Sequence, residues 1–256
     1  MKVLYNYCLL ILVIGVFYSC APRKNLVYFQ GIEKHGFNEL KDYSPILKPD
    51  DRLSISVSSI DYEATKPFNL PVAAFSGNQL TTTSTPQLQT YLIGKDGMID
   101  FPKLGMLKLS GLTRLECVNL IEKKLEKYLQ EPQVVMKLLN FSVSVLGEVS
   151  SPGIKSVTRE RYTILDAIAA AKDLTVYGKR KNILVVRETE EGLTYNRIDL
   201  TSAEVFNSPV YYLQQNDVVY VEPNKPRINS STNSSTNGII ISSVSLLLTI
   251  ISITLR

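Results

Sequence analysis

The C-terminal segment, residues 238–256, constrains the fold of this chain more than any other feature. It is rich in isoleucine and leucine and carries no charge before Arg256. At ~1.5 Å rise per residue, a helix over residues 239–255 would be about 26 Å long, which is enough to cross a thin bilayer. Because a helix satisfies its own backbone N–H and C=O groups, lipid can surround it. We therefore expect residues 239–256 to form an amphipathic helix that spans a membrane.

The few polar residues of this segment lie on one side of the expected helix. With about 100° between successive residues, most of them fall within about 80° of arc. These residues are Gly238, Ser242, Ser245, Thr249, Ser252 and Arg256. The stripe can line a water-filled lumen between several copies of the helix, or its small residues can let helices pack closely. In a single tail anchor, the stripe would be a chance arrangement. Periodicity by itself favours close packing over a lumen.

The N-terminus has the pattern of a bacterial secretory signal. An apolar run over residues 3–18 ends in Ser19-Cys20, and the run is broken directly afterwards. A cysteine at this place resembles the lipobox of bacterial lipoproteins, in which the thiol receives a diacylglycerol before the preceding segment is removed. We therefore expect residues 1–19 to be a lipoprotein signal peptide, Cys20 the lipid attachment site and residues 20–42 a tether. The alternative is a signal-anchor helix with an incidental cysteine.

Charge and cysteine content exclude several classes of protein. The chain has 28 Lys and Arg against 24 Asp and Glu, so loss of Lys2 with the signal lowers the formal net charge from +4 to +3. This charge is too low to indicate nucleic-acid binding. Of the three cysteines, Cys8 leaves with the signal and Cys20 is modified. The remaining Cys117 cannot form an intrachain disulfide, and we predict that it packs in a core.

Residues that could support catalysis are scarce. The single histidine, His35, lies in the expected tether, so we expect no catalytic triad. One histidine and one thiol cannot make the usual metal sites, and no glycine-rich phosphate loop is found. Glu131, Glu148 and Asp217 could act in glycoside hydrolysis only if two of them met, and their spacing gives no sign of this. We predict that the protein is not an enzyme and has no catalytic residues, metal or cofactor.

Residues 43–223 alternate β-patterned runs with two helical patterns, which predicts two small α+β domains. Apolar residues alternate with serine over residues 53–57, as expected for a half-buried strand. A hairpin is predicted over residues 91–101, with its turn at Gly94–Gly97. Residues 67–86 lack periodicity and indicate a long loop.

Two capping boxes predict helix starts. Thr113 with Glu116 opens a first helix that should end before Pro132, and Thr163 with Asp166 opens a second. Apolar residues of the first helix recur at helical spacing and should face the core. They are Leu115, Val118, Ile121, Leu125 and Leu129. A strand, the second helix and further strands then indicate a β-grasp-like module.

Several short motifs occur in a characteristic order. After the lipoprotein start come residues 46–57, 97–105, 111–113 and 128–134, and then residues 145–149, 152–153, 163–168 and 213–221. In this order and spacing they resemble the polysaccharide export family of bacterial outer-membrane lipoproteins (Wza type), in which an export domain is followed by a soluble-ligand-binding β-grasp domain. Two places depart from the family pattern. Asp50 stands where the family often has glycine, and Lys172-Asp173 interrupts an expected Ala-Gly-Gly turn.

The resemblance implies a domain order for the mature chain. The polysaccharide export domain would cover residues 43–140, the β-grasp domain 141–223, a polar linker of little stiffness 224–238, and the outer-membrane-spanning helix 239–256. The family forms a homo-oligomeric ring, in which periplasmic domains enclose a cavity and the C-terminal helices form an α-helical barrel through the outer membrane.

On this interpretation the protein is a passive channel that exports capsular or exopolysaccharide from the periplasm to the cell surface. The lumen would be lined by Ser242, Ser245, Thr249 and Ser252. An inner-membrane polysaccharide co-polymerase of the tyrosine autokinase type would be its periplasmic partner, and outer-membrane lipid would surround the barrel. The alternative is a lipid-anchored periplasmic glycan-binding or adaptor protein without a pore, which, unlike a channel, could be monomeric.

Overall fold

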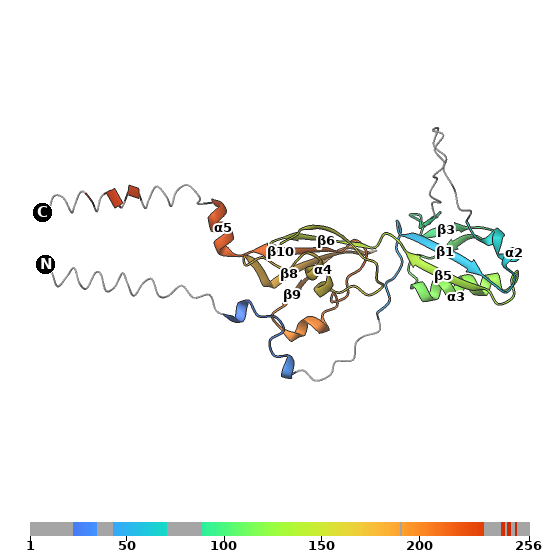
Figure 1. Cartoon of the computed structure of the whole chain (residues 1–256), viewed down its shortest axis with the longest axis horizontal. Helices are drawn as coiled ribbons and strands as arrows, with labels where there is room; N and C mark the ends of the chain where they lie inside the picture. Colours follow the sequence, from blue (N-terminus) through green and yellow to red (C-terminus); the bar gives the residue numbers. More distant parts are fainter. Residues whose placement is uncertain are drawn as a thin grey trace, which may run out of the picture.

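In the computed structural model, two α+β domains lie one after the other along the long axis of the molecule (Figure 1). The residues that the structure describes are 23–34, 43–70, 89–189, 191–232, 242, 243, 245, 246 and 249. The predicted signal peptide 1–19, Cys20, His35, Ser252 and most of the predicted loop 67–86 lie outside this set. Each domain has its own hydrophobic core.

The first domain is built on a three-stranded antiparallel sheet in the order β2-β1-β5. Its strands are β1 (Arg52–Ser58), β2 (Tyr91–Leu92) and β5 (Gln133–Leu138), and a separate hairpin consists of β3 (Met98–Phe101) and β4 (Gly105–Lys108). The helical elements are α2 (Tyr62–Thr65), the 3-10 turn η3 (Lys66–Phe68) and α3 (Arg114–Leu125). The predicted alternation of β1 is confirmed, because Leu53, Ile55 and Val57 are all buried.

The predicted hairpin over residues 91–101 is wrong in its strand pairing. Its turn is present, since the Gly97 N–H donates to the Gly94 carbonyl at 2.8 Å and Gly97 has a φ of 77°. However, β2 pairs with β1, and β3 pairs with β4. A second turn at residues 101–105, with Lys103 at a φ of 64°, returns the chain directly onto β3. This shorter connection supplies the partner of β3 and leaves β2 for the edge of β1.

The first predicted helix is confirmed at its start and ends before Pro132 as predicted, but it does not extend to Leu129. Thr113 and Glu116 form both halves of the capping box, but α3 ends at Leu125, well before Pro132. The prediction for Leu115 is wrong, because this side chain is 59% exposed. It lies about 100° around the helix from the centre of the buried face, where Cys117 is fully buried instead.

The second domain is a five-stranded sheet in the order β7-β6-β10-β8-β9. The strands are β6 (Ser142–Gly147), β7 (Gly153–Ser156), β8 (Gly178–Thr189), β9 (Gly192–Ile198) and β10 (Val218–Pro223). The first and last strands, β6 and β10, are parallel neighbours, and the other pairs are antiparallel. Helix α4 (Ile164–Ala170) begins at the predicted Thr163–Asp166 capping box. This is the β-grasp arrangement predicted from the sequence.

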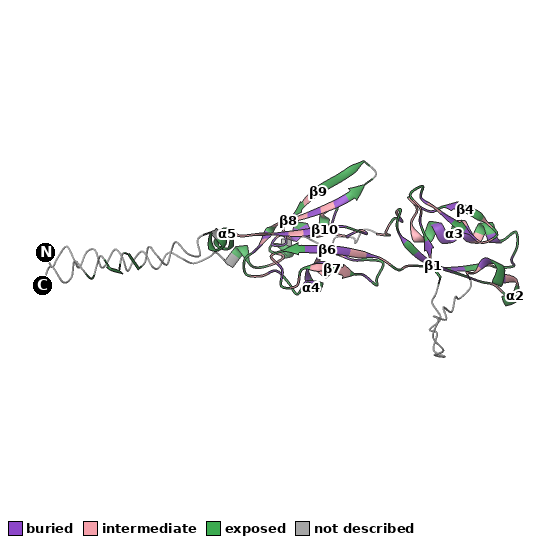
Figure 2. Cartoon of the chain, turned by 90° about the horizontal axis from the view of Figure 1, so that it is seen from above, coloured by how far each residue is buried: buried purple, intermediate pink, exposed green. Residues whose placement is uncertain are grey.

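Burial alternates along the strands of the second domain (Figure 2). On β10, Val219 and Val221 are fully buried, and Tyr220 between them is not. The buried face packs against Ile164 and Ile168 of α4 and against Leu213. A 3-10 helix, η4 (Ala203–Asn207), follows β9 and contributes Val205 to the same core. The sheet is therefore covered on one face by α4 and its neighbouring loops.

Segments on both sides of the domains also have structure. The expected tether contains two 3-10 turns, η1 (Arg23–Asn25) and η2 (Ile32–Lys34), and the expected polar linker contains α5 (Lys225–Thr232). The expectation of little stiffness is therefore wrong for the first half of the linker. Asn224 caps α5, because its side-chain oxygen accepts from the Arg227 N–H at 3.1 Å.

Candidate functional site

Three of the predicted lumen residues lie in the described part of the C-terminal segment. Ser242, Ser245 and Thr249 have helical backbone conformation and are exposed. The Thr249 hydroxyl donates a hydrogen bond to the Ser245 carbonyl at 2.8 Å. This hydroxyl therefore has an acceptor on its own chain, one helical turn earlier. Such a residue can face lipid, water or another helix. Within the residues that the structure describes, no helix combines the length and apolar character needed to cross a membrane.

The described segments next to the two chain ends, η1 and α5, lie at one end of the second domain. Turn η1 and helix α5 both lie at the end of this domain that faces away from the first domain (Figure 1). Helix α2 of the first domain lies at the opposite end of the molecule (Figure 1). The predicted lipid site and the predicted membrane helix therefore adjoin segments at the same end of the domain.

The N-terminal strap, defined here as residues 26–30, binds along the second domain by its backbone. The Phe29 N–H donates to the Leu200 carbonyl at 3.1 Å, and the Gln30 N–H donates to the Thr201 carbonyl at 2.7 Å. Phe29 also packs on Phe206, with 5.4 Å between ring centroids. The strap thus runs beside residues 200–203 like a short added strand.

Tyr28 of the strap is held by two charged residues. Its hydroxyl donates to the Asp173 carboxylate at 2.5 Å, and its ring lies under the Arg180 guanidinium, 5.6 Å from the centroid. Partial burial, followed by the hydrogen bond to Asp173, raises the pKa of Tyr28 far above its usual value. The sequence analysis assigned no role to Tyr28, although it lies in a short apolar run over residues 26–29.

Helix α5 is held by a second set of contacts at the same end of the domain. The Arg227 guanidinium pairs with the Glu148 carboxylate at 2.9 Å and lies 5.7 Å from the Tyr177 ring centroid. The backbone N–H of Asn224 donates to the Tyr177 carbonyl at 2.8 Å. Because one contact is ionic and another involves the backbone, the start of α5 has a defined position on the domain.

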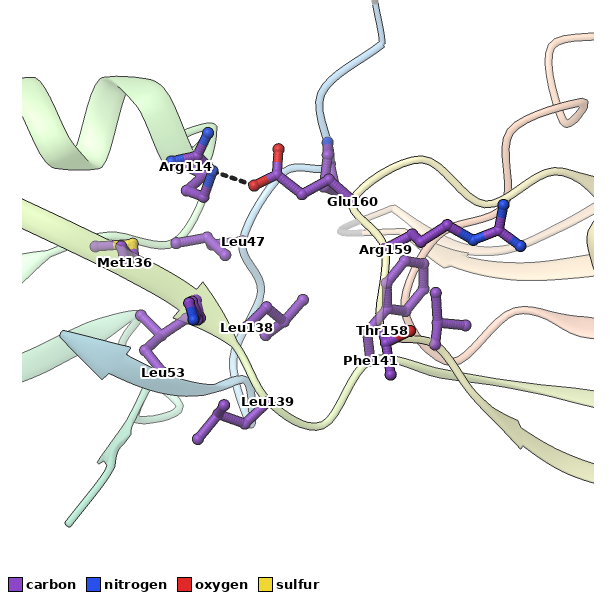
Figure 3. A pocket seen from close by; sticks show the side chains of 13 residues that line it. Leu47, Leu53, Arg114, Met136, Leu138, Leu139, Phe141, Thr158, Arg159 and Glu160 are labelled. Atoms are coloured by element: carbon purple, nitrogen blue, oxygen red, sulfur yellow. Dashed lines mark ion pairs between the residues drawn. The ribbon is translucent and has the colours of Figure 1, made fainter. Parts of the chain in front are cut away.

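A cleft of about 440 Å³ lies between the two domains (Figure 3). Leu47, Leu138 and Leu139 line its first-domain side, and Phe141 lines the second-domain side (Figure 3). An ion pair between Arg114 of α3 and Glu160 of the β7–α4 loop joins the two sides. The sequence could not predict this cleft, because its walls come together only when the domains pack.

The connection between the domains is fixed by hydrogen bonds. The Asn140 side chain accepts from the Arg52 N–H at 2.8 Å and donates to the Asp50 carbonyl at 3.0 Å. The Gln215 amide donates to the Asn140 carbonyl at 2.9 Å and accepts from the Ser142 N–H at 2.8 Å. These bonds tie both domains to Asn140, where the chain passes from the first domain to the second.

Aromatic stacking and further hydrogen bonds also cross from one domain to the other. Tyr43 stacks on Tyr212 with 4.7 Å between centroids, and its hydroxyl donates to the Leu213 carbonyl at 3.1 Å. The Lys48 ammonium donates to the Glu188 carbonyl at 3.1 Å. Tyr212 of the second domain therefore packs against a residue that precedes the first domain's sheet.

The three carboxylates considered for glycoside hydrolysis have separate partners or surroundings. Asp217 is fully buried and pairs with Arg187 at 2.7 Å. Glu148 pairs with Arg227 and accepts from the Thr175 hydroxyl, and Glu131 is exposed. No pair of these three forms a shared site in the described region, and no group of three or more His, Cys, Asp or Glu there could hold a metal ion.

Comparison with known proteins identifies the class of this chain. Residues 39–139 match the family described as polysaccharide biosynthesis/export protein, and residues 142–221 match the SLBB domain family. The two matches follow one another along the chain and correspond to the two domains of the structure. The chain belongs to the polysaccharide export family.

Two curated relatives support this assignment. The EPS I polysaccharide export outer membrane protein EpsA of Ralstonia solanacearum is 28% identical over 149 residues, which cover 54% of this chain and 37% of the relative. The protein of the same name from Ralstonia nicotianae is 29% identical over 106 residues, which cover 40% of this chain and 28% of the relative. The matched region thus spans well under half the length of these relatives.

Proposed function

We propose that this protein is the outer-membrane channel subunit of a polysaccharide exporter. Several copies form a closed ring, and their C-terminal helices, residues 239–256, form an α-helical barrel through the outer membrane. Lipid on Cys20 anchors each copy, and the two folded domains stand in the periplasm. Capsular or exopolysaccharide passes through the ring to the cell surface. The curated relatives are named as polysaccharide export outer membrane proteins, which supports this proposal.

The observation that carries the proposal is that η1 and α5, the described segments next to the two chain ends, lie at the same end of the second domain (Figure 1). A lipid anchor and a spanning helix that start there can enter the same membrane. The long axis of the molecule then points away from that membrane, and the export domain reaches into the periplasm. A ring of such subunits would enclose a path along this axis.

The polar stripe suits a passive conduit. Ser242, Ser245 and Thr249 are exposed hydroxyl residues on a helical segment. Hydroxyls offer a hydrated sugar chain many weak contacts, and weak contacts allow the chain to leave each position as easily as it enters. The mechanism needs no catalytic group in this chain, because the energy for transport would come from the inner-membrane co-polymerase of the tyrosine autokinase type.

The far end of the first domain is the proposed contact for that co-polymerase. Ile60 and Tyr62, at the start of α2, are 71% and 70% exposed. Large apolar side chains at this exposure are typical of surfaces that bind another protein. Helix α2 and helix α5 lie at opposite ends of the molecule (Figure 1). In the proposed orientation, the end that carries α2 would face the inner membrane.

The test of the conduit is obstruction of its lumen. Ser245→Trp should block export of polysaccharide to the cell surface, because the indole would fill the proposed lumen. Leu247→Trp is the matched control, since residue 247 lies about 180° around the expected helix from the centre of the polar stripe and faces lipid in the proposal. Both variants must reach wild-type amounts in the outer membrane. Equal export by the two variants would contradict the conduit and favour the adaptor protein without a pore.

A further inference from the structure

The loop between α4 and β8, residues 171–177, contacts the segments at both chain ends. We propose that this α4–β8 loop couples the N-terminal strap to α5, so that the two membrane-directed ends are positioned as one unit. This inference deepens the proposed function and rests on it, because the proposed function places both chain ends in the same membrane. The contacts that form the coupling are independent of that assignment.

On the strap side, the contact is made by Asp173. One oxygen of its carboxylate accepts from the Tyr28 hydroxyl at 2.5 Å and from the Leu174 N–H at 2.6 Å. The same oxygen therefore fixes the strap and the backbone of the loop. The Asp173 carbonyl also accepts from the Ser150 N–H at 2.9 Å, which ties the loop to the segment after β6.

On the α5 side, Tyr177 of the loop contacts the start of α5 directly, and Glu148 bridges α5 to the loop. The Tyr177 carbonyl accepts from the Asn224 N–H, and its ring lies under the Arg227 guanidinium. Glu148 uses one oxygen for Arg227 and the other for the Thr175 hydroxyl at 2.8 Å. Helix α5 is thus linked to two residues of the loop.

Arg180 and Thr175 connect the two sides. The Arg180 guanidinium, which covers the Tyr28 ring, donates to the Thr175 carbonyl at 3.3 Å. The Thr175 hydroxyl in turn accepts from the Tyr177 N–H at 3.1 Å. The contacts therefore run without a gap from Tyr28 through Arg180, Thr175 and Glu148 to Arg227. A change at either end can alter the loop that holds the other.

The backbone of the loop supports this role. Lys172 and Asp173 have φ values of 58° and 65°, a region that favours glycine and costs other residues free energy. Glycine at 173 would relieve this cost but would remove the carboxylate that holds Tyr28. The departure from the family pattern at this position coincides with the contact that binds the strap.

The experiment is hydrogen–deuterium exchange on the full-length, lipidated protein in detergent. Tyr28→Phe removes the hydroxyl and keeps the ring. Exchange in the strap, residues 26–30, should become about tenfold faster, because a hydrogen bond to a charged group is lost. Exchange in α5 should also rise, by several-fold. Arg227→Gln should give the reciprocal result, with faster exchange in α5 and also in the strap.

Tyr195→Phe is the matched control, because Tyr195 is an exposed tyrosine on β9 in the same domain. It should leave both segments unchanged. Faster exchange confined to the segment that carries each substitution would overturn the coupling, as would unchanged exchange in the strap of Tyr28→Phe. The result is separate from the proposed function: reciprocal exchange in a protein that exports nothing would keep the coupling and reject the channel.

Discussion

The buried ion pair between Arg187 and Asp217 should be essential for the stability of the second domain. Arg187 on β8 is 8% exposed, and Asp217, directly before β10, is fully buried. The guanidinium approaches the carboxylate with N–O distances of 2.7, 2.9 and 3.2 Å. Asp217 also accepts from the Gln214 N–H, and Arg187 donates to the Tyr212 carbonyl. Each charge therefore depends on the other for most of its compensation.

Arg187→Met should lower the free energy of unfolding by about 3–5 kcal/mol, because it leaves the Asp217 carboxylate buried without its cation. Adding Asp217→Asn to this variant should recover about half of the loss, since the uncompensated charge is then removed. The double variant still lacks the bond from Arg187 to the Tyr212 carbonyl, so recovery should be incomplete.

Urea unfolding of the full-length protein in a mild detergent, followed by circular dichroism, measures both values. The control is Lys66→Met, which removes an ion pair to Glu63 whose side chains are 56% and 73% exposed. Exposed pairs of this kind contribute below about 1 kcal/mol. If Arg187→Met costs no more than Lys66→Met, or if the double variant is less stable than the single one, the reasoning from buried charge is refuted.

Three further predictions concern single residues. Burial raises the pKa of Asp51 to about 6 against 3.8 in an unfolded chain, despite the opposing hydrogen bond from the Lys48 N–H. The folded state thus binds the proton of the Asp51 carboxyl group more tightly than the unfolded state does. The free energy of unfolding should therefore fall by roughly 3 kcal/mol as pH rises from about 4 to 7. Asp51→Asn should remove most of this slope in urea midpoints taken across that range, and an unchanged slope would contradict the assignment. Lys172→Gly should raise the free energy of unfolding by about 1 kcal/mol, because it relieves a φ of 58° at an exposed side chain; a loss of stability in the same urea assay would contradict this. Cys117 is fully buried and its pKa is raised to about 12, so thiol reagents should modify it only after unfolding; rapid modification of the native protein would show that the α3 core is open.

Local signals in the sequence predicted the local elements well. The capping boxes at Thr113 and Thr163 and the alternation of β1 depend on residues close together in the chain. Strand pairing depends on competition between distant segments, and for this reason the partner of β2 was wrong. The extension of the first helix to Leu129 was also wrong, because the apolar spacing continues to this residue, which is buried without being helical.

The departures from the family pattern occur at positions where the backbone has a positive φ. Asp50, Lys172 and Asp173 all adopt positive φ, with values of 69°, 58° and 65°. Glycine reaches this region without cost, which explains why a family would use glycine there. Asp50 and Asp173 fit the known tolerance of aspartate for this conformation.

The contacts of the strap and the cleft between the domains could not be predicted from the sequence. The contact of Tyr28 with Asp173 joins residues 145 positions apart, and no periodic pattern marks the strap. The cleft with Arg114 and Glu160 forms only between packed domains. The lumen residues Ser242, Ser245 and Thr249 stay a prediction, because a lumen is a property of several chains together.

The most direct test of the proposed channel is the mass of the complex extracted in detergent from the outer membrane. The full-length lipidated protein is compared with a version truncated after residue 238. A channel should give one large, discrete oligomer for the full-length protein and a smaller or less stable assembly after truncation. A strictly monomeric full-length protein across detergents and concentrations would contradict the channel, because a single copy of the helix cannot enclose a lumen.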